Sequence, residues 1–214
     1  MRQTPPPIPA ASPGAKAASR RRLCLLAGLA ALMPLAMAGE RPGMEVQAER
    51  IGELIHVQAQ AVVQAPLSIV WATLTDYERL PEFIPGIETS RVLARDGHRI
   101  TVAQTGQARF LFLSLPIEVT LVSTEHPPHV VEVRRIAGSL RHLDGRYEAT
   151  TLPGRRVRLR WTGSLSSEAE LPPLISTALA RLSIEDQFEG MVREIERRAG
   201  RLPPDAPTDR RLAR

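Results

Sequence analysis

The chain has 214 residues, a length that suits one domain or two small ones. It holds 28 Lys and Arg residues against 23 Asp and Glu, but positions 1–38 contain five of the basic residues and none of the acidic ones. Residues 39–214 are therefore formally neutral. This argues against a nucleic-acid binder, because such proteins need surplus positive charge to release phosphate counterions. The single cysteine, Cys24, precedes position 39, so disulfides, thiolate nucleophiles and cysteine-ligated metals are excluded from the remainder.

The N-terminal part has the pattern of an export signal. Three consecutive arginines precede an apolar run of 14 residues at 23–36, which as a helix would extend about 21 Å, short of the ~30 Å core of a membrane. Ala36 and Ala38 place small residues where signal peptidase requires them, before Gly39. The pattern predicts cleavage after Ala38 and a periplasmic or otherwise exported mature protein. The arginines also resemble a twin-arginine signal, so both export routes stay open.

The first predicted elements are a strand and two short helices. Apolar and polar residues alternate over 53–63, which is typical of a half-buried antiparallel strand. Pro66 is expected to open a helix, since its missing N–H is not needed in the first turn. A second helical turn is expected over 76–80, and Ile84-Pro85-Gly86 ends it.

Six further strands and a long helix follow. Asp96-Gly97 and Leu152-Pro153-Gly154 are turn signals between neighbouring strands. The expected strands span 88–95, 99–105, 110–122, 130–136, 140–150 and 156–165. A pair of prolines at 172–173 opens a helix that runs to the neighbourhood of Arg198, and its apolar stripe changes side near Ser183. We interpret that change as a bend, or as two different partners for the two halves of the helix.

These elements predict an α+β fold. A curved antiparallel sheet of about seven strands would wrap around the C-terminal helix, with two short helices after the first strand. Helix and sheet of such lengths leave a pocket where they do not close against each other. The expected organisation is an export signal at 1–38, a flexible segment at 39–52, a ligand-binding domain at 53–199 and a disordered tail at 200–214.

Three stretches are similar to one known family. The run WATLTDYERLPEFIPGIETSRVL, from Trp71 to Leu93, resembles the opening helices of polyketide cyclase/dehydrase-like, START-related proteins (the SRPBCC group). The stretches IAGSLRHLDGRYE and LPPLISTALARL resemble that family's glycine-containing strand pair and final helix, although the family has Trp where this chain has Tyr147. The resemblance implies a helix-grip (START/Bet v 1-like) fold with an apolar cavity, in a family that mostly binds lipids, polyketides or other hydrophobic molecules. Because this fold serves carriers, cyclases and protein-binding modules alike, function has to be argued from the site.

Large apolar side chains are the candidates for the cavity lining, because the chain has few aromatic residues and ligand pockets are lined by such side chains. The alternative for each of them is a place in a filled core. The candidates are Trp71, Phe83, Phe110, Phe112, Trp161, Leu174, Leu182 and Phe188.

Tyr77, Arg109 and His142 are the polar candidates for the cavity. Tyr77 either orients a ligand carbonyl or packs with its hydroxyl at the surface. His142 either forms an acid–base pair with Asp144, since residues two apart on a strand share a face, or belongs to an exposed ion pair. No nucleophile or phosphate-binding motif is visible, so no catalytic residue is predicted. Two histidines that flank a proline pair at 127–128 lack a third ligand, and neither a metal nor a cofactor is expected.

The sequence favours an exported carrier or sensor that holds a hydrophobic small molecule, such as a lipid or isoprenoid, between sheet and helix. The alternative is a polyketide cyclase or dehydratase acting on an apolar substrate in the same cavity. A protein-interaction module is a third hypothesis, for which an exported neutral domain is poorly placed. Expected partners are the apolar ligand and, transiently, a membrane surface, but not nucleic acid; the oligomeric state is not predicted. Inward-facing titratable groups that converge on one spot would favour the enzyme.

Overall fold

The structure, a computed structural model, describes residues 43–110 and 113–200. The predicted export signal at 1–38, and all of the predicted tail except residue 200, lie outside the described residues. The strands in the described ranges are β1 (Met44–Ile51), β2 (Leu54–Val63), β3 (Ile87–Asp96), β4 (Arg99–Phe110), β5 (Leu113–His126), β6 (Val130–Gly138), β7 (Leu140–Leu152) and β8 (Arg156–Ser167). The helices are α1 (Leu67–Leu74), the short 3-10 helix η1 (Tyr77–Arg79), α2 (Leu80–Phe83) and α3 (Pro173–Ala199).

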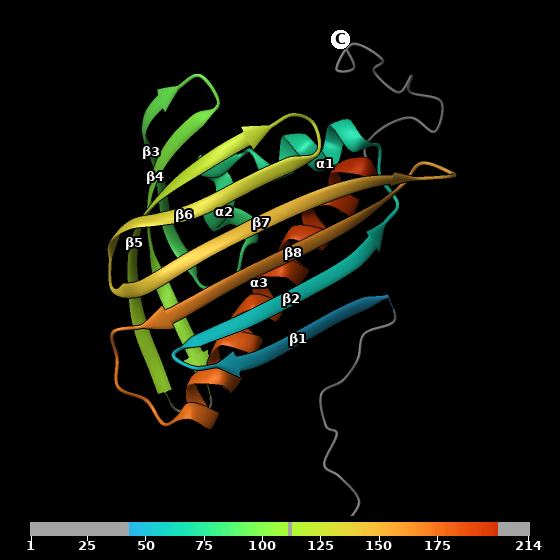
Figure 1. Cartoon of the computed structure of the whole chain (residues 1–214). Coiled ribbons are helices and arrows are strands. Elements are labelled where there is room, and N and C mark those ends of the chain that lie inside the picture. Colours follow the sequence, from blue (N-terminus) through green and yellow to red (C-terminus); the bar gives the residue numbers. More distant parts are fainter. Residues whose placement is uncertain (1–42, 111–112, 201–214) are drawn as a thin grey trace, which may run out of the picture. The chain divides into compact units, whose positions relative to one another are not determined.

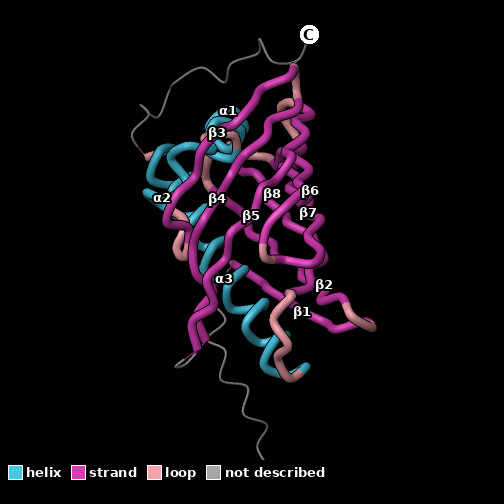
Figure 2. The backbone as a smooth tube through the Cα atoms, turned by 90° about the vertical axis from the view of Figure 1, so that its left-hand side faces the viewer, coloured by secondary structure: helices cyan, strands magenta, loops and turns pink. Residues whose placement is uncertain are grey.

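The strands form one antiparallel sheet in the order β1-β2-β8-β7-β6-β5-β4-β3. This sheet curves around α3, and the short helices α1 and α2 lie at the end of the sheet where α3 finishes (Figure 1). Seen from the side, the helices lie on one face of the strands (Figure 2). The predicted α+β architecture, a curved antiparallel sheet around a long C-terminal helix, is confirmed. None of the helices in the described ranges is both long and apolar enough to cross a membrane.

The strand β1 corrects two expectations. Residues 39–52 were expected to be flexible and the sheet to have about seven strands, but Met44–Ile51 pairs along its whole length with β2 and makes the eighth strand. Half-buried Met44, Val46 and Ala48 alternate with exposed polar residues, so β1 covers one edge of the core. Gly52 has a φ of 61°, which permits the tight turn that joins β1 to β2.

The helix α3 is continuous over 27 residues but has two environments. Its second half is anchored in the core, where Phe188, Met191 and Ile195 are at most 3% exposed. In its first half, Leu174 is 86% exposed. The change of side near Ser183 therefore marks two partners for one helix: the packed core on one half, and solvent and an internal cavity on the other.

The indole of Trp161 lies over a pair of glycines in the middle of the sheet. Gly145 and Gly163 are directly paired between β7 and β8, and a Cβ atom added to Gly163 would lie 2.5 Å from Cη2 of Trp161 and 2.8 Å from the backbone oxygen of Asp144. Only glycine fits here without displacing the ring or the strand. Trp161 is 4% exposed, so the glycine pair allows a large aromatic ring to lie close to the sheet.

An ion-pair cluster ties the end of α3 to the segment after α1. Arg198 donates to Asp76 Oδ2 at 2.8 Å and to Glu194 Oε1 at 2.7 Å, and its guanidinium lies 5.3 Å from the ring centre of Phe83. Glu194 is only 5% exposed and also accepts hydrogen bonds from Arg197. These hydrogen bonds lower the pKa of Glu194 from 4.5 to about 2, with Arg197 making the largest contribution.

Replacement of Gly163 by alanine is expected to destabilise the domain by about 1–3 kcal/mol, because the added methyl must displace Trp161 or the β7 backbone. Urea unfolding followed by tryptophan fluorescence measures the change. The matched control is Gly200→Ala, where the new Cβ would have no neighbour closer than 3.5 Å. The control should change stability by no more than about 0.5 kcal/mol. Equal stability of the two variants would contradict the close packing of Trp161 on this glycine pair.

The Glu194 cluster predicts a loss of stability in acid. Because the folded-state pKa of about 2 is below the ordinary value of 4.5, the stabilisation is complete above pH 4.5 and is lost as the pH falls through 2. With allowance for solvent screening of the partly exposed arginine partner, the loss attributable to Glu194 is about 2 kcal/mol. Urea unfolding at pH 6 and pH 3 of the native protein and of Glu194→Gln tests this. The variant should be less stable at pH 6 and should show a smaller decline towards pH 3; an unchanged decline would place the acid sensitivity elsewhere.

Candidate functional site

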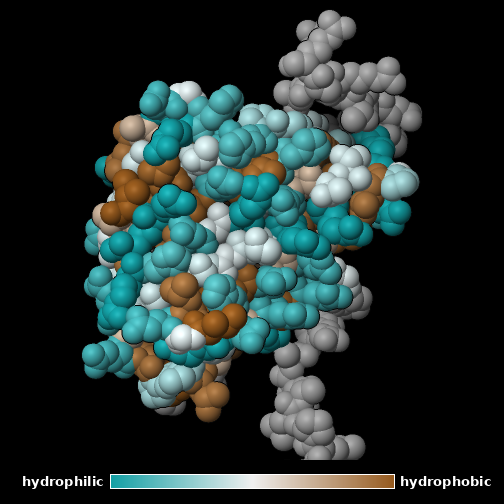
Figure 3. All heavy atoms as spheres, in the orientation of Figure 1, coloured by the Kyte–Doolittle hydropathy of each residue, from teal (hydrophilic) through white to brown (hydrophobic). Residues whose placement is uncertain are grey.

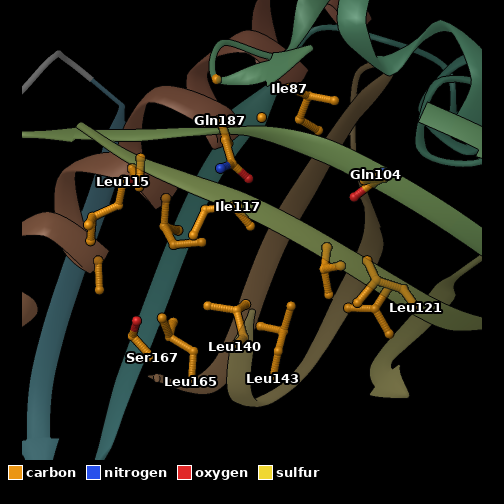
Figure 4. Close-up of a pocket in the computed structure, with 18 of the residues that line it drawn as sticks. Ile87, Gln104, Leu115, Ile117, Leu121, Leu140, Leu143, Leu165, Ser167 and Gln187 are labelled. Carbon is orange, nitrogen blue, oxygen red and sulfur yellow. The ribbon is translucent and has the colours of Figure 1, made fainter. Parts of the chain in front are cut away.

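A cavity of about 510 Å³ lies between the concave face of the sheet and α3. Its volume is in the range of about 300–1,000 Å³ that is typical of small-molecule sites. Most of its wall comes from the inward-facing positions of β4 to β8, because every second residue of a strand faces the same side. The aliphatic residues of this wall that are labelled in Figure 4 are Leu115, Ile117, Leu121, Leu140, Leu143 and Leu165.

The helix α3 supplies the opposite wall. Its cavity-facing residues recur every three or four positions, and several of them are small or polar, namely Ser176, Ala180, Ser183 and Gln187, beside the larger Leu179 and Ile184. Because the short side chains among them reach only a little way towards the sheet, the space above the central strands stays open. The first half of α3 therefore bounds the cavity and the second half closes the core, which accounts for the two environments of the helix.

At the η1 end of the cavity, the lining residue Tyr77 hydrogen-bonds to a carboxyl group that lies outside the lining. The Tyr77 hydroxyl donates a hydrogen bond to Glu125 Oε1 at 3.0 Å, and the neighbouring Ser123 is 2% exposed. Burial, and then the negative charge of Glu125, raise the pKa of Tyr77 far above its usual value. The phenol therefore keeps its proton throughout the physiological range and acts as a hydrogen-bond donor.

A second tyrosine lies on the sheet side of the cavity. Tyr147 on β7 is paired with Trp161 on β8, and the two rings meet edge to face with their centres 6.4 Å apart. Burial alone raises the pKa of the Tyr147 hydroxyl. Its hydroxyl makes no hydrogen bond to another residue in the part of the chain that the structure describes.

The mouth of the cavity is charged. Arg50 comes from the end of β1 and Glu53 from the turn before β2. Arg141 lies at the start of β7, and Glu168 and Glu170 lie in the loop between β8 and α3. All five side chains are exposed. Arg50 donates to Ser176 Oγ at 3.1 Å, and Arg141 lies 4.0 Å from Glu53, so the rim is held together by polar contacts.

Of the predicted lining residues, the structure places Trp161 and Tyr77 on the cavity wall. Trp71 packs against the core, Phe83 lies under Arg198, and Phe188 is fully buried, so these three rings fill the anchored end of the domain instead of lining the cavity. This corrects the expectation that the aromatic residues gather in the pocket. Apolar area stabilises the core wherever it is buried, and the chain buries these rings where α3 meets α1 and α2.

The remaining apolar candidates divide into two groups. Leu174 points to solvent, and Leu182 is half-buried; neither lines the cavity, because the face of α3 that carries them is turned away from it. Phe112 and the side chain of Phe110 lie outside the described residues.

Arg109 and His142 lie on the outer face of the sheet and not in the cavity. Arg109 is exposed and donates to Gln107 Oε1 at 3.3 Å. A register shift between Leu140 and His142 turns the histidine outward, where its Nε2 lies 3.0 Å from Ser164 Oγ and 3.6 Å from Asp144. This face is mainly hydrophilic (Figure 3). Of the two alternatives for His142, its position therefore agrees with a surface contact to Asp144 and not with acid–base chemistry inside the cavity.

Several cavity residues were not predicted from the sequence, above all Gln104 and Gln187. Gln104 lies two positions after buried Val102 on β4, and Gln187 lies on the α3 face that also carries Ile184 and Met191. Strand parity and helical spacing, applied to polar residues as well as apolar ones, would have identified both. Within the described ranges, no group of three or more His, Cys, Asp or Glu side chains is arranged to hold a metal ion.

Several solved structures share this architecture at low identity. The Zhui aromatase/cyclase from Streptomyces sp. R1128 is 19% identical, with a TM-score of 0.59 over 69% of this chain and 94% of that one. A STAR-related lipid transfer protein from Xanthomonas axonopodis is 10% identical, with a TM-score of 0.62 over 74% of this chain and 96% of that one. The lipid transfer and protein localization domain of human StarD13 is 14% identical, with a TM-score of 0.56 over 75% and 86% of the two chains. At these identities the likeness shows the fold alone, and it confirms the predicted helix-grip, START-like fold.

Sequence comparison gives the family. No curated protein matches the chain. The family model described as polyketide cyclase/dehydrase and lipid transport matches residues 63–192, more than half of the chain, and it includes the first block of resemblance, Trp71 to Leu93. The chain therefore belongs to the polyketide cyclase/dehydrase and lipid transport family.

Proposed function

We propose that this protein is an exported carrier or sensor that holds one hydrophobic small molecule, such as a lipid or isoprenoid, in the cavity between the sheet and α3. The observation that carries the proposal is the cavity itself: about 510 Å³, walled mainly by aliphatic side chains and open at a charged rim. Removing apolar surface from water contributes roughly 25 cal/mol per Å², so an apolar ligand gains free energy by entering such a space.

The family and the fold support hydrophobic-ligand binding in general, and the chemistry of the cavity favours a carrier over an enzyme. The titratable groups in the inner part of the cavity include Tyr77 and Tyr147, and burial raises the pKa of both hydroxyls. An effective general acid or base has a pKa near the working pH, and these phenols are shifted in the opposite direction. They suit hydrogen bonding to a ligand better than proton transfer.

A cyclase or dehydratase acting on an apolar substrate is the alternative. The observation in its favour is the hydrogen bond between Tyr77 and Glu125 beside buried Ser123, which brings polar groups together at the deep end of the cavity. The Tyr77 hydroxyl is already directed at Glu125, however, so this arrangement uses its donor to hold η1 against β5. We therefore place the carrier first.

Export and membrane contact belong to the same proposal. The arginine run, the apolar stretch and the small residues before Gly39 support cleavage and a periplasmic or otherwise exported mature protein. Exposed Leu174 and Ile175 at the start of α3, beside the rim residue Ser176, support transient contact with a membrane surface when ligand is taken up or released.

Filling the cavity tests the proposed function. Leu165→Trp adds an indole to the cavity wall, so the affinity of the mature protein for the neutral dye N-phenyl-naphthylamine should fall about tenfold or more. The matched control is Arg160→Trp, which places the same side chain on the exposed outer face of the same strand and should leave dye affinity unchanged. Fluorescence titration measures both. If the two variants bind the dye equally, or if the native protein does not bind it, the cavity is not a ligand site.

A further inference from the structure

The cavity contains polar side chains whose hydrogen-bonding capacity the protein does not use. Gln187 on α3 makes no hydrogen bond to any residue in the described ranges. One turn earlier on the same helix face, Ser183 Oγ is buried with no hydrogen-bond partner among the described residues. Gln104 on β4 donates from Nε2 to Ser90 Oγ at 3.3 Å, which leaves its amide oxygen as an acceptor. The Ser183 hydroxyl is buried, so leaving it unsatisfied costs free energy unless a ligand or water completes it, whereas the two half-buried glutamines offer unused hydrogen-bonding capacity to a molecule in the cavity.

The two glutamines lie on one side of the cavity. Figure 4 shows Gln104 and Gln187 on the side of Ile87, with Leu140, Leu143 and Leu165 on the opposite side. The two amides thus lie beside Ile87, and the opposite side is mainly aliphatic, with Ser167 next to Leu165. A ligand that fits both walls has a long apolar body and an oxygen that both donates and accepts hydrogen bonds.

The charges around the cavity oppose an ionised ligand. The charged side chains of its lining are the five exposed rim residues, two arginines and three glutamates. Arg141 lies 4.0 Å from Glu53, Arg50 donates to the neutral Ser176 hydroxyl, and the three glutamates of the rim outnumber its two arginines, which disfavours an anionic ligand there. Deeper in the cavity an ionised group would be removed from water without a counter-ion, which costs several kcal/mol.

We propose that the ligand is a neutral long-chain or isoprenoid alcohol, whose hydroxyl hydrogen-bonds to Gln104 and Gln187 and whose hydrocarbon chain lies against the aliphatic wall. This inference rests on the proposed function and adds to it the chemical class of the ligand. The Gln187 amide donates to the hydroxyl oxygen, and the hydroxyl donates to the amide oxygen of Gln104. An uncharged hydroxyl thus makes one hydrogen bond with each amide and brings no buried charge.

Four probes of equal chain length test the inference: dodecanol, dodecane, dodecanoate and dodecylamine, each used to displace N-phenyl-naphthylamine from the mature protein. Dodecanol should bind about five- to tenfold more tightly than each of the other three, because one or two hydrogen bonds separate it from dodecane and desolvation disfavours the ions. In Gln187→Leu the preference for dodecanol over dodecane should fall about fivefold while dodecane binding is retained. The matched control, Gln58→Leu at an exposed position of β2, should keep the native preference.

The outcomes separate the two proposals. If dodecanoate or dodecylamine binds as tightly as dodecanol, or if Gln187→Leu keeps the full preference for the alcohol, the ligand class is wrong while the carrier function stands. If none of the four displaces a bound dye, or if no dye binds at all, the carrier function itself fails. The affinities of the four probes for the native protein show whether a charged ligand is disfavoured, even if the Gln187 variant does not fold.

Discussion

The second half of α3 is anchored at one end of the sheet, and the existence of the cavity depends on that anchor. Phe188, Met191 and Ile195 are buried there, and each contributes about 1.5–3 kcal/mol through the removal of apolar surface from water. Arg198 bridges Glu194 on the same helix and Asp76, which holds the helix against the segment that follows α1. The helix packs against β1 and β2 on one flank of the curved sheet and against β4 near the other. Because the helix is supported from both flanks, the space over the central strands stays open.

The chemistry of this space changes along its length. Exposed charges of both signs mark the rim, aliphatic side chains and two amides form the middle, and the Tyr77–Glu125 hydrogen bond closes the deep end. Such a gradient orients an amphipathic molecule without holding an ion in the interior. The tyrosines inside the cavity also distinguish between the two functions that the family and the fold allow, a carrier and a cyclase. Their raised pKa values suit hydrogen bonding and not proton transfer.

The sequence predicts the fold well because local signals agree with one another. Alternation of apolar residues, turns such as Asp96-Gly97 and Pro153-Gly154, and the long final helix all indicate the same curved sheet, and the glycines at 97 and 154 do take positive φ. The strand β1 was missed although Met44, Val46 and Ala48 alternate, because the short segment follows directly on the predicted signal and its inward residues are only half-buried. Alternation of apolar and polar residues predicts β1 when it is followed from Met44 instead of from Glu53.

The site was less predictable, for physical reasons. Large rings stabilise any apolar environment, so composition alone does not distinguish the filled end of the domain, with Trp71 and Phe188, from the open middle. The outward turn of His142 depends on a register shift at Leu140, a feature that sequence alternation does not reveal. Gln187 was not among the predicted polar residues, although the helical spacing that places Ile184 and Met191 on the inward face also places Gln187 there.

Native mass spectrometry of the protein purified from the cells that produce it, followed by extraction and identification of any bound molecule, tests most directly whether the cavity is a ligand site. We expect a polypeptide that, with the proposed signal removed, begins at Gly39 and carries one uncharged apolar molecule. After the protein has been emptied, we expect it to take up such a molecule from a membrane extract. A polypeptide that is empty as isolated, and stays empty after exposure to the extract, would contradict the claim that the space between the sheet and α3 is a ligand site.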